Sequence, residues 1–124
     1  MPRGTVFVVD DDASVRKALH RLIRAAGFDV ESFADCGAYL ERAPPPVPAC
    51  IVLDIRMPGI TGFEFQRAIA GTHRDLPIVF ITGHGGEEVR AQGLEAGAVA
   101  VLFKPIDEEA LVAAIEKALV TPRP

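Results

Sequence analysis

The chain has 124 residues, enough for one domain with a single hydrophobic core, and it is 49% hydrophobic and 24% charged. The length excludes a disulfide-dependent miniprotein, and the composition excludes a disordered chain. Because the net charge is −4, we expect no broad basic surface and no direct binding of nucleic acid. No apolar run approaches the ~20 residues of a membrane span, and the N-terminal run is too short for a signal peptide, so we expect a cytoplasmic protein without a membrane partner.

Short apolar runs alternate along the chain with segments of helical periodicity. The expected strands are residues 5–9, 28–33, 49–53, 78–81 and 99–103, and the expected helices are residues 13–26, 35–42, 62–70, 87–96 and 107–120. Asp12 is suited to cap the first helix, and Gly27 is suited to end it. Five strand-then-helix units predict an α/β fold in which helices cover both faces of a parallel sheet.

The composition of the strands also predicts their order. The second expected strand carries Asp29, Glu31 and Ser32, whereas the first, third and fourth are almost continuously apolar, with Cys50 as a buried thiol. Strands covered on both faces are apolar throughout, so the second strand belongs at an edge. An edge position fits the flavodoxin-like, doubly wound (βα)5 order 2-1-3-4-5, in which ligands bind at the carboxyl ends of the first and third strands. We expect one domain over residues 1–124, with a core from about residue 5 to 120 and residues 121–124 as a tail or the start of a linker.

Polar residues follow four of the five expected strands. They are Asp10, Asp11 and Asp12 after the first, Asp54 after the third, Thr82 after the fourth and Lys104 after the fifth. Each one alone has an ordinary explanation as a helix cap or a solvated charge. Because parallel strands end at the same rim of a sheet, all of them together predict a functional site at that rim.

The chemistry of these groups indicates what the rim binds. Converging carboxylates repel one another unless a cation offsets their charge, and Mg²⁺, or Mn²⁺ in its place, takes oxygen ligands of this kind. Lys104 would supply a second positive charge. An aspartate between a metal and a lysine can attack a phosphoryl group, and the hydroxyl of Thr82 and the backbone N–H groups of Gly83 and His84 could hold that group.

Four segments at these strand ends resemble the signature of bacterial two-component response-regulator receiver domains, most closely the FixJ type within the CheY-like superfamily. They are VVDDD at residues 8–12, LDIRMPGITG at 53–62, ITGHG at 81–85 and FKP at 103–105. The resemblance extends from about residue 5 to 120. It implies that Asp54 accepts a phosphoryl group from a sensor histidine kinase or a phosphotransfer protein.

The resemblance also assigns roles to the other residues at the rim. It implies a Mg²⁺ site formed by Asp10, Asp11, Asp54 and the backbone carbonyl of Arg56. Thr82 and Lys104 are implied to contact the phosphoryl group, and the peptide bond between Lys104 and Pro105 is implied to be cis. Arg56 and His84 each lie two residues beyond a site residue, so we expect them to overhang the phosphoryl group and to set the rate of its hydrolysis.

One departure from the family pattern affects signal output. Receivers commonly carry an aromatic residue three positions before the lysine, where this chain has Val101. Valine cannot swing as an aromatic ring does, so we expect Phe103, or the segment 83–88, to transmit the signal. The output is expected from a partner or an effector domain absent from this chain, with phosphorylation-dependent homodimerisation as one possible form.

Two alternatives to a phosphorylation switch remain open at the level of sequence. The first is a Mg²⁺-dependent phosphohydrolase with an aspartyl-phosphate intermediate. Such hydrolases carry a second acid two residues after the nucleophile, whereas this chain has Arg56 there, which favours a phosphoacceptor signalling domain over an enzyme. The second is a receiver-like interaction module that is never phosphorylated, which is disfavoured because every ligand-type residue is present.

Overall fold

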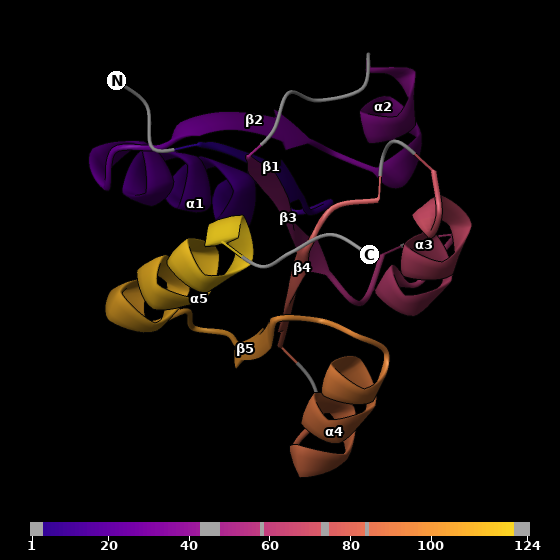
Figure 1. Ribbon diagram of the computed structural model, residues 1–124. Helices are drawn as coiled ribbons and strands as arrows, with labels where there is room; N and C mark the ends of the chain where they lie inside the picture. Colours follow the sequence, from indigo (N-terminus) through magenta and orange to yellow (C-terminus); the bar gives the residue numbers. More distant parts are fainter. Residues whose placement is uncertain (1–3, 43–47, 58, 73–74, 84, 121–124) are drawn as a thin grey trace.

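The computed structural model describes residues 4–42, 48–57, 59–72, 75–83 and 85–120, and the expected tail at 121–124 lies outside them. The strands are β1 (Thr5–Val9), β2 (Asp29–Phe33), β3 (Ala49–Asp54), β4 (Ile78–Thr82) and β5 (Ala100–Phe103). The helices are α1 (Ala13–Ala25), α2 (Cys36–Glu41), α3 (Gly62–Ile69), α4 (Glu87–Glu95) and α5 (Glu108–Val120). All strands are parallel and their order is β2-β1-β3-β4-β5, which confirms the predicted fold class and topology (Figure 1).

Alternate residues of the strands enter two separate cores. Phe7 and Val9 face the core beneath α2, α3 and α4, whereas Val6 and Val8 face the core beneath α1 and α5. Figure 1 shows α1 and α5 on one side of the sheet and the other three helices on the opposite side. The edge strand β2 is only partly buried, as its charged residues predict. Cys50 is fully buried in the second core, and burial raises the pKa of its thiol to about 12.

Two strands extend one residue further than the sequence predicts. Hydrogen bonding within the sheet continues beyond the apolar runs, so Asp54 is the last residue of β3 and Thr82 is the last residue of β4. The backbone N–H of Ile55 donates to the carbonyl oxygen of Ile81 at 3.0 Å, which holds the two strand ends side by side. Both site residues are therefore positioned by the sheet itself and not by a loop.

Helix boundaries differ from the predicted ones mainly at caps. Asp12, Asp35 and Asp107 each accept hydrogen bonds from backbone N–H groups in the first turns of α1, α2 and α5. The predicted ranges counted Asp35 and Asp107 as helical, whereas a capping residue has an extended backbone and lies just outside the helix. None of the helices in the described part of the chain is long and apolar enough to cross a membrane.

Candidate functional site

Three aspartates meet at the carboxyl ends of the two central strands. Asp10 follows β1, Asp11 comes next, and Asp54 ends β3. One carboxylate oxygen from each of the three lies within 4.8 Å of the others. Asp10 and Asp54 are buried and Asp11 is exposed, so Asp11 is the member of this cluster in contact with solvent.

The ammonium group of Lys104, just beyond β5, bridges the two buried carboxylates. Its Nζ lies 3.1 Å from Oδ2 of Asp10 and 3.4 Å from Oδ2 of Asp54. Burial acts to lower the pKa of Lys104, but the hydrogen bond and the charge of Asp10, together with Asp54, outweigh it and raise that pKa overall. Lys104 therefore stays protonated at neutral pH and offsets part of the charge of the aspartates.

The pKa of Asp54 is raised by some neighbouring groups and lowered by others. Its Oδ1 accepts a hydrogen bond from the backbone N–H of Arg56 at 3.1 Å, and its Oδ2 accepts one from Lys104. Burial and the neighbouring Asp10 carboxylate nevertheless raise the pKa of Asp54 above its usual range. One ammonium group thus leaves the site short of positive charge when all three aspartates are ionised.

This donor set fits a hard divalent cation. Carboxylate oxygens are the protein ligands that Mg²⁺ prefers, and Mg²⁺ commonly keeps several waters, which the exposed side of the cluster allows. Asp10, Asp11 and Asp54 would hold such an ion. The ion would supply the positive charge that Lys104 alone does not provide.

The remaining predicted residues surround this cluster at different depths. Thr82 is buried, and its carbonyl oxygen accepts the backbone N–H of Lys104 at 2.8 Å, which joins the ends of β4 and β5. Gly83 is exposed, and a Cβ added to it would lie 3.9 Å from Cδ of Lys104. The side chain of Arg56 is exposed although its N–H binds Asp54. The Lys104–Pro105 peptide bond is cis, and His84 lies outside the described residues.

Two residues that the sequence analysis missed support the site from behind. The guanidinium of Arg16, on α1, donates to the carbonyl oxygen of Asp10 at 2.7 Å. A Cβ on Gly62 would lie 3.0 Å from Cα of Ile55 and 3.2 Å from the carbonyl oxygen of Asp54, so a side chain here would push the start of α3 away from the end of β3. The glycine at the end of the motif at 53–62 could have indicated the close approach of Gly62 to β3. Helical periodicity could not have indicated the contact of Arg16 with Asp10.

The response regulator receiver domain model matches residues 6–116 of the chain. This chain belongs to that family. The receiver is 38% identical over 113 residues to nodulation protein W and 38% identical over 117 residues to transcriptional regulatory protein FixJ, both of Bradyrhizobium diazoefficiens. These matches cover 91% and 94% of the receiver but 50% and 57% of the two relatives, so the chain spans about half their length.

Solved structures show the same relationship. The FixJ-N crystal structure superposes with a TM-score of 0.86 at 33% identity, covering 100% of the receiver and 99% of that chain. The response regulator StyR has a TM-score of 0.82 at 47% identity, covering 93% of the receiver and 58% of that chain. The receiver is therefore of the FixJ type found in two-component signalling, whose members interact with histidine kinases and bind Mg²⁺ at an acidic pocket.

The raised pKa of Asp54 predicts a stability gain when its charge is removed. A carboxyl group whose pKa is higher in the folded than in the unfolded state lowers the free energy of unfolding once the pH exceeds the usual pKa of 3.8. This destabilisation persists at neutral pH. We expect Asp54→Asn to raise Tm by a few degrees at pH 7 in Mg²⁺-free buffer, with the gain shrinking on acidification. Thermal unfolding followed by circular dichroism at several pH values measures this.

The matched control is Asp29→Asn, which neutralises an exposed carboxylate on β2. Its Tm should follow that of the wild-type protein at every pH. An Asp54→Asn protein that is no more stable than wild type at pH 7 would contradict the argument.

Proposed function

We propose that the receiver accepts a phosphoryl group on Asp54 in a Mg²⁺-dependent reaction. The observation that supports this most is the position of Asp54, whose carboxylate contacts Lys104 at 3.4 Å and lies within 4.8 Å of two further carboxylates suited to a metal. In the reaction, an oxygen of Asp54 forms a bond to phosphorus while the bond between phosphorus and the donor atom breaks. The ammonium group of Lys104 then offsets charge on the phosphoryl oxygens.

The surrounding groups have supporting roles in this proposal. Bound Mg²⁺ supplies the second positive charge at the transferring group, held by Asp10, Asp11 and Asp54 with the backbone carbonyl of Arg56. The hydroxyl of Thr82 and the backbone N–H groups of Gly83 and His84 hold the transferred phosphoryl oxygens. Mn²⁺ would serve in place of Mg²⁺ because it takes the same oxygen ligands.

The donor in this proposal is a sensor histidine kinase or a phosphotransfer protein in the cytoplasm. Membership of the FixJ type supports a histidine-borne donor. The output is proposed to pass to a partner or an effector domain, since the matched relatives are about twice as long as the receiver. A homodimer formed on phosphorylation is one such output. The phosphohydrolase alternative is not favoured, because the position two residues after Asp54 carries Arg56 in place of an acid.

Labelling with acetyl phosphate tests the acceptor. Wild-type protein with Mg²⁺ should gain about 80 Da in intact mass, one phosphoryl group. Asp54→Asn should gain none, and Asp11→Asn should need a higher Mg²⁺ concentration for the same labelling. Asp29→Asn serves as the control and should label as wild type. Stoichiometric labelling of Asp54→Asn would overturn the assignment, and rapid release of phosphate without a lasting adduct would support the hydrolase.

Arg56 is proposed to set the lifetime of the phosphorylated state. Its backbone N–H donates to Asp54 and its side chain is exposed, so we expect that side chain to overhang the acceptor where water must approach in line. Arg56→Ala should shorten the half-life of the adduct by about threefold or more, measured as loss of the added mass after removal of acetyl phosphate. Arg67→Ala, an exposed arginine on α3, should leave the half-life unchanged. His84→Ala is the second variant, and unchanged half-lives in both Arg56→Ala and His84→Ala would remove this proposal.

The packing of α4 on β5 supports a proposed signalling route that does not depend on the side chain of Val101. Val101 is fully buried, and a Cβ on Gly93 of α4 would lie 2.5 Å from its Cγ2. Helix α4 therefore lies directly on β5 at the position of Val101. Phe103 lies on the same face of the sheet as Val101 and pairs in register with Thr82.

Phe103 also contacts the first part of α4. The guanidinium of Arg90 lies 5.1 Å from the centre of the Phe103 ring, and Arg90 forms an ion pair with Glu87 at 3.4 Å. We therefore propose that a movement at Thr82 reaches α4 through Phe103 and Arg90. This route leads to the surface formed by α4, β5 and α5.

Beryllofluoride, a phosphoryl mimic, tests this route by NMR. With Mg²⁺ it should shift the amide resonances of residues 87–100 in wild-type protein, and Arg90→Ala should reduce those shifts by about half or more while the shifts around Asp54 persist. Glu95→Ala, at the far end of α4, is the control and should respond as wild type. Resonances of α4 that stay fixed while those around Asp54 and Thr82 move would contradict the route.

A further inference from the structure

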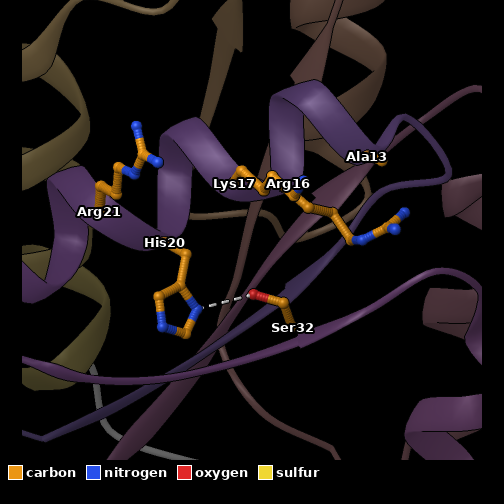
Figure 2. A pocket seen from close by; sticks show the side chains of 6 residues that line it. All are labelled: Ala13, Arg16, Lys17, His20, Arg21 and Ser32. Atoms are coloured by element: carbon orange, nitrogen blue, oxygen red, sulfur yellow. Dashed lines mark hydrogen bonds between the residues drawn. The ribbon is translucent and has the colours of Figure 1, made fainter.

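Helix α1 is basic in an otherwise acidic protein. It carries four cations, Arg16, Lys17, Arg21 and Arg24, and no acidic residue, in a chain of net charge −4. A pocket of about 270 Å³ beside the helix is lined by Ala13, Arg16, Lys17, His20, Arg21 and Ser32 (Figure 2). Figure 2 shows Arg16 turned away from His20 and Arg21, so these basic side chains do not converge on one ligand. The orientation of Arg16 instead follows from its own hydrogen bond to the functional site.

That hydrogen bond completes the contacts of Asp10, which is fully buried. The N–H of Asp10 donates to the carbonyl of Phe33 at 3.2 Å, its Oδ1 accepts from the N–H of Asp12 at 2.9 Å, and its Oδ2 accepts from Lys104 at 3.1 Å. The remaining polar group, the carbonyl oxygen, accepts from Nη1 of Arg16 at 2.7 Å. Each polar group of Asp10 thus has a partner, and loss of the guanidinium would remove a hydrogen bond from a buried carbonyl.

The carbonyl of Asp10 and the N–H of Asp11 belong to one rigid peptide plane. A contact that fixes the carbonyl therefore also fixes the direction in which the chain enters Asp11, the exposed member of the aspartate cluster. We propose that Arg16 is a positioning residue for the metal site, which orients the Asp10–Asp11 peptide so that both carboxylates face the same ion. This inference rests on the proposed Mg²⁺ site. It adds Arg16, which contacts the backbone carbonyl of Asp10 and not the carboxylates that would bind the ion.

The chemistry of arginine suits this position. Its guanidinium presents several N–H donors in a planar fork, so it can donate to a carbonyl oxygen from a residue that is half-buried on the helix. Lysine keeps the charge and can donate to the same oxygen, but from a single flexible point. The expected order of metal affinity is therefore Arg16 first, then Arg16→Lys, then Arg16→Ala.

Calorimetric titration of the unphosphorylated chain with Mg²⁺ alone measures this order. Residues that orient metal ligands typically change affinity by 10–100-fold when removed, so Arg16→Ala should raise the Kd for Mg²⁺ about tenfold. Arg21→Ala is the matched control, since it removes the same side chain and charge from the same pocket. Its Kd should stay within about twofold of wild type, because long-range charge effects at an exposed site are screened.

Amide hydrogen exchange in Mg²⁺-free protein gives a second readout that needs no metal. The amides of Asp11 and Asp12 should exchange faster in Arg16→Ala and not in Arg21→Ala, because only the first variant frees the peptide. An unchanged Kd in Arg16→Ala, or equal weakening in Arg21→Ala, overturns the proposal. If Arg16→Ala fails to fold, Arg16→Gln and Arg16→Lys test the proposal instead. A wild-type Kd for Mg²⁺ in both variants overturns the proposal, and a larger rise in Kd for Arg16→Gln than for Arg16→Lys supports it.

The Mg²⁺ titration, together with labelling by acetyl phosphate, separates this inference from the proposed function. A wild-type chain that binds Mg²⁺ and is labelled on Asp54, with Arg16→Ala behaving identically, overturns the role of Arg16 alone. A wild-type chain that binds no Mg²⁺ overturns the metal site and the proposed function with it.

Discussion

The contact of one ammonium group with two buried carboxylates is the constraint on which the rest of the site depends. Lys104 lies within 3.4 Å of both Asp10 and Asp54, and without it two like charges would be buried side by side with no counter-charge. A single ammonium does not neutralise a cluster of three carboxylates, so the site keeps an excess of negative charge. That excess suits the cluster to a divalent cation, which together with Lys104 would offset the negative charge of a phosphoryl group.

The strands of the sheet, and not long loops, bring these groups together. Asp54 and Thr82 are the last residues of their strands, and Asp10 and Lys104 each follow a strand directly. Two cores on opposite faces of the sheet hold the strands in place, and the polar residues lie together at the carboxyl ends of those strands. The supporting contacts come from the helices: α1 reaches the carbonyl of Asp10 through Arg16, and α3 starts against β3 at Gly62. The polar rim is therefore preorganised by the same packing that stabilises the fold.

On the side of the receiver formed by α4 and β5, the helix packs closely on the strand. Gly93 allows α4 to lie directly on the buried Val101, three residues before the lysine. The glycine on the helix leaves space for the valine on the strand, so the two elements pack closely at this point. The aromatic side chain near the lysine is Phe103, which is only partly buried and contacts Arg90 at the start of α4.

The sequence by itself determined the α/β class, the strand order and the gathering of acids, hydroxyl and lysine at one rim. It did so because strands covered on both faces must be apolar, because the polar strand β2 must therefore lie at an edge, and because parallel strands end on the same side. Only the tertiary structure decided where β3 and β4 end, since hydrogen bonds to neighbouring strands extend them to Asp54 and Thr82. Only the tertiary structure brought Arg16 to Asp10 and Gly93 to Val101. Such contacts depend on distances of a few ångströms between separate elements, and hydrophobic periodicity does not predict those distances.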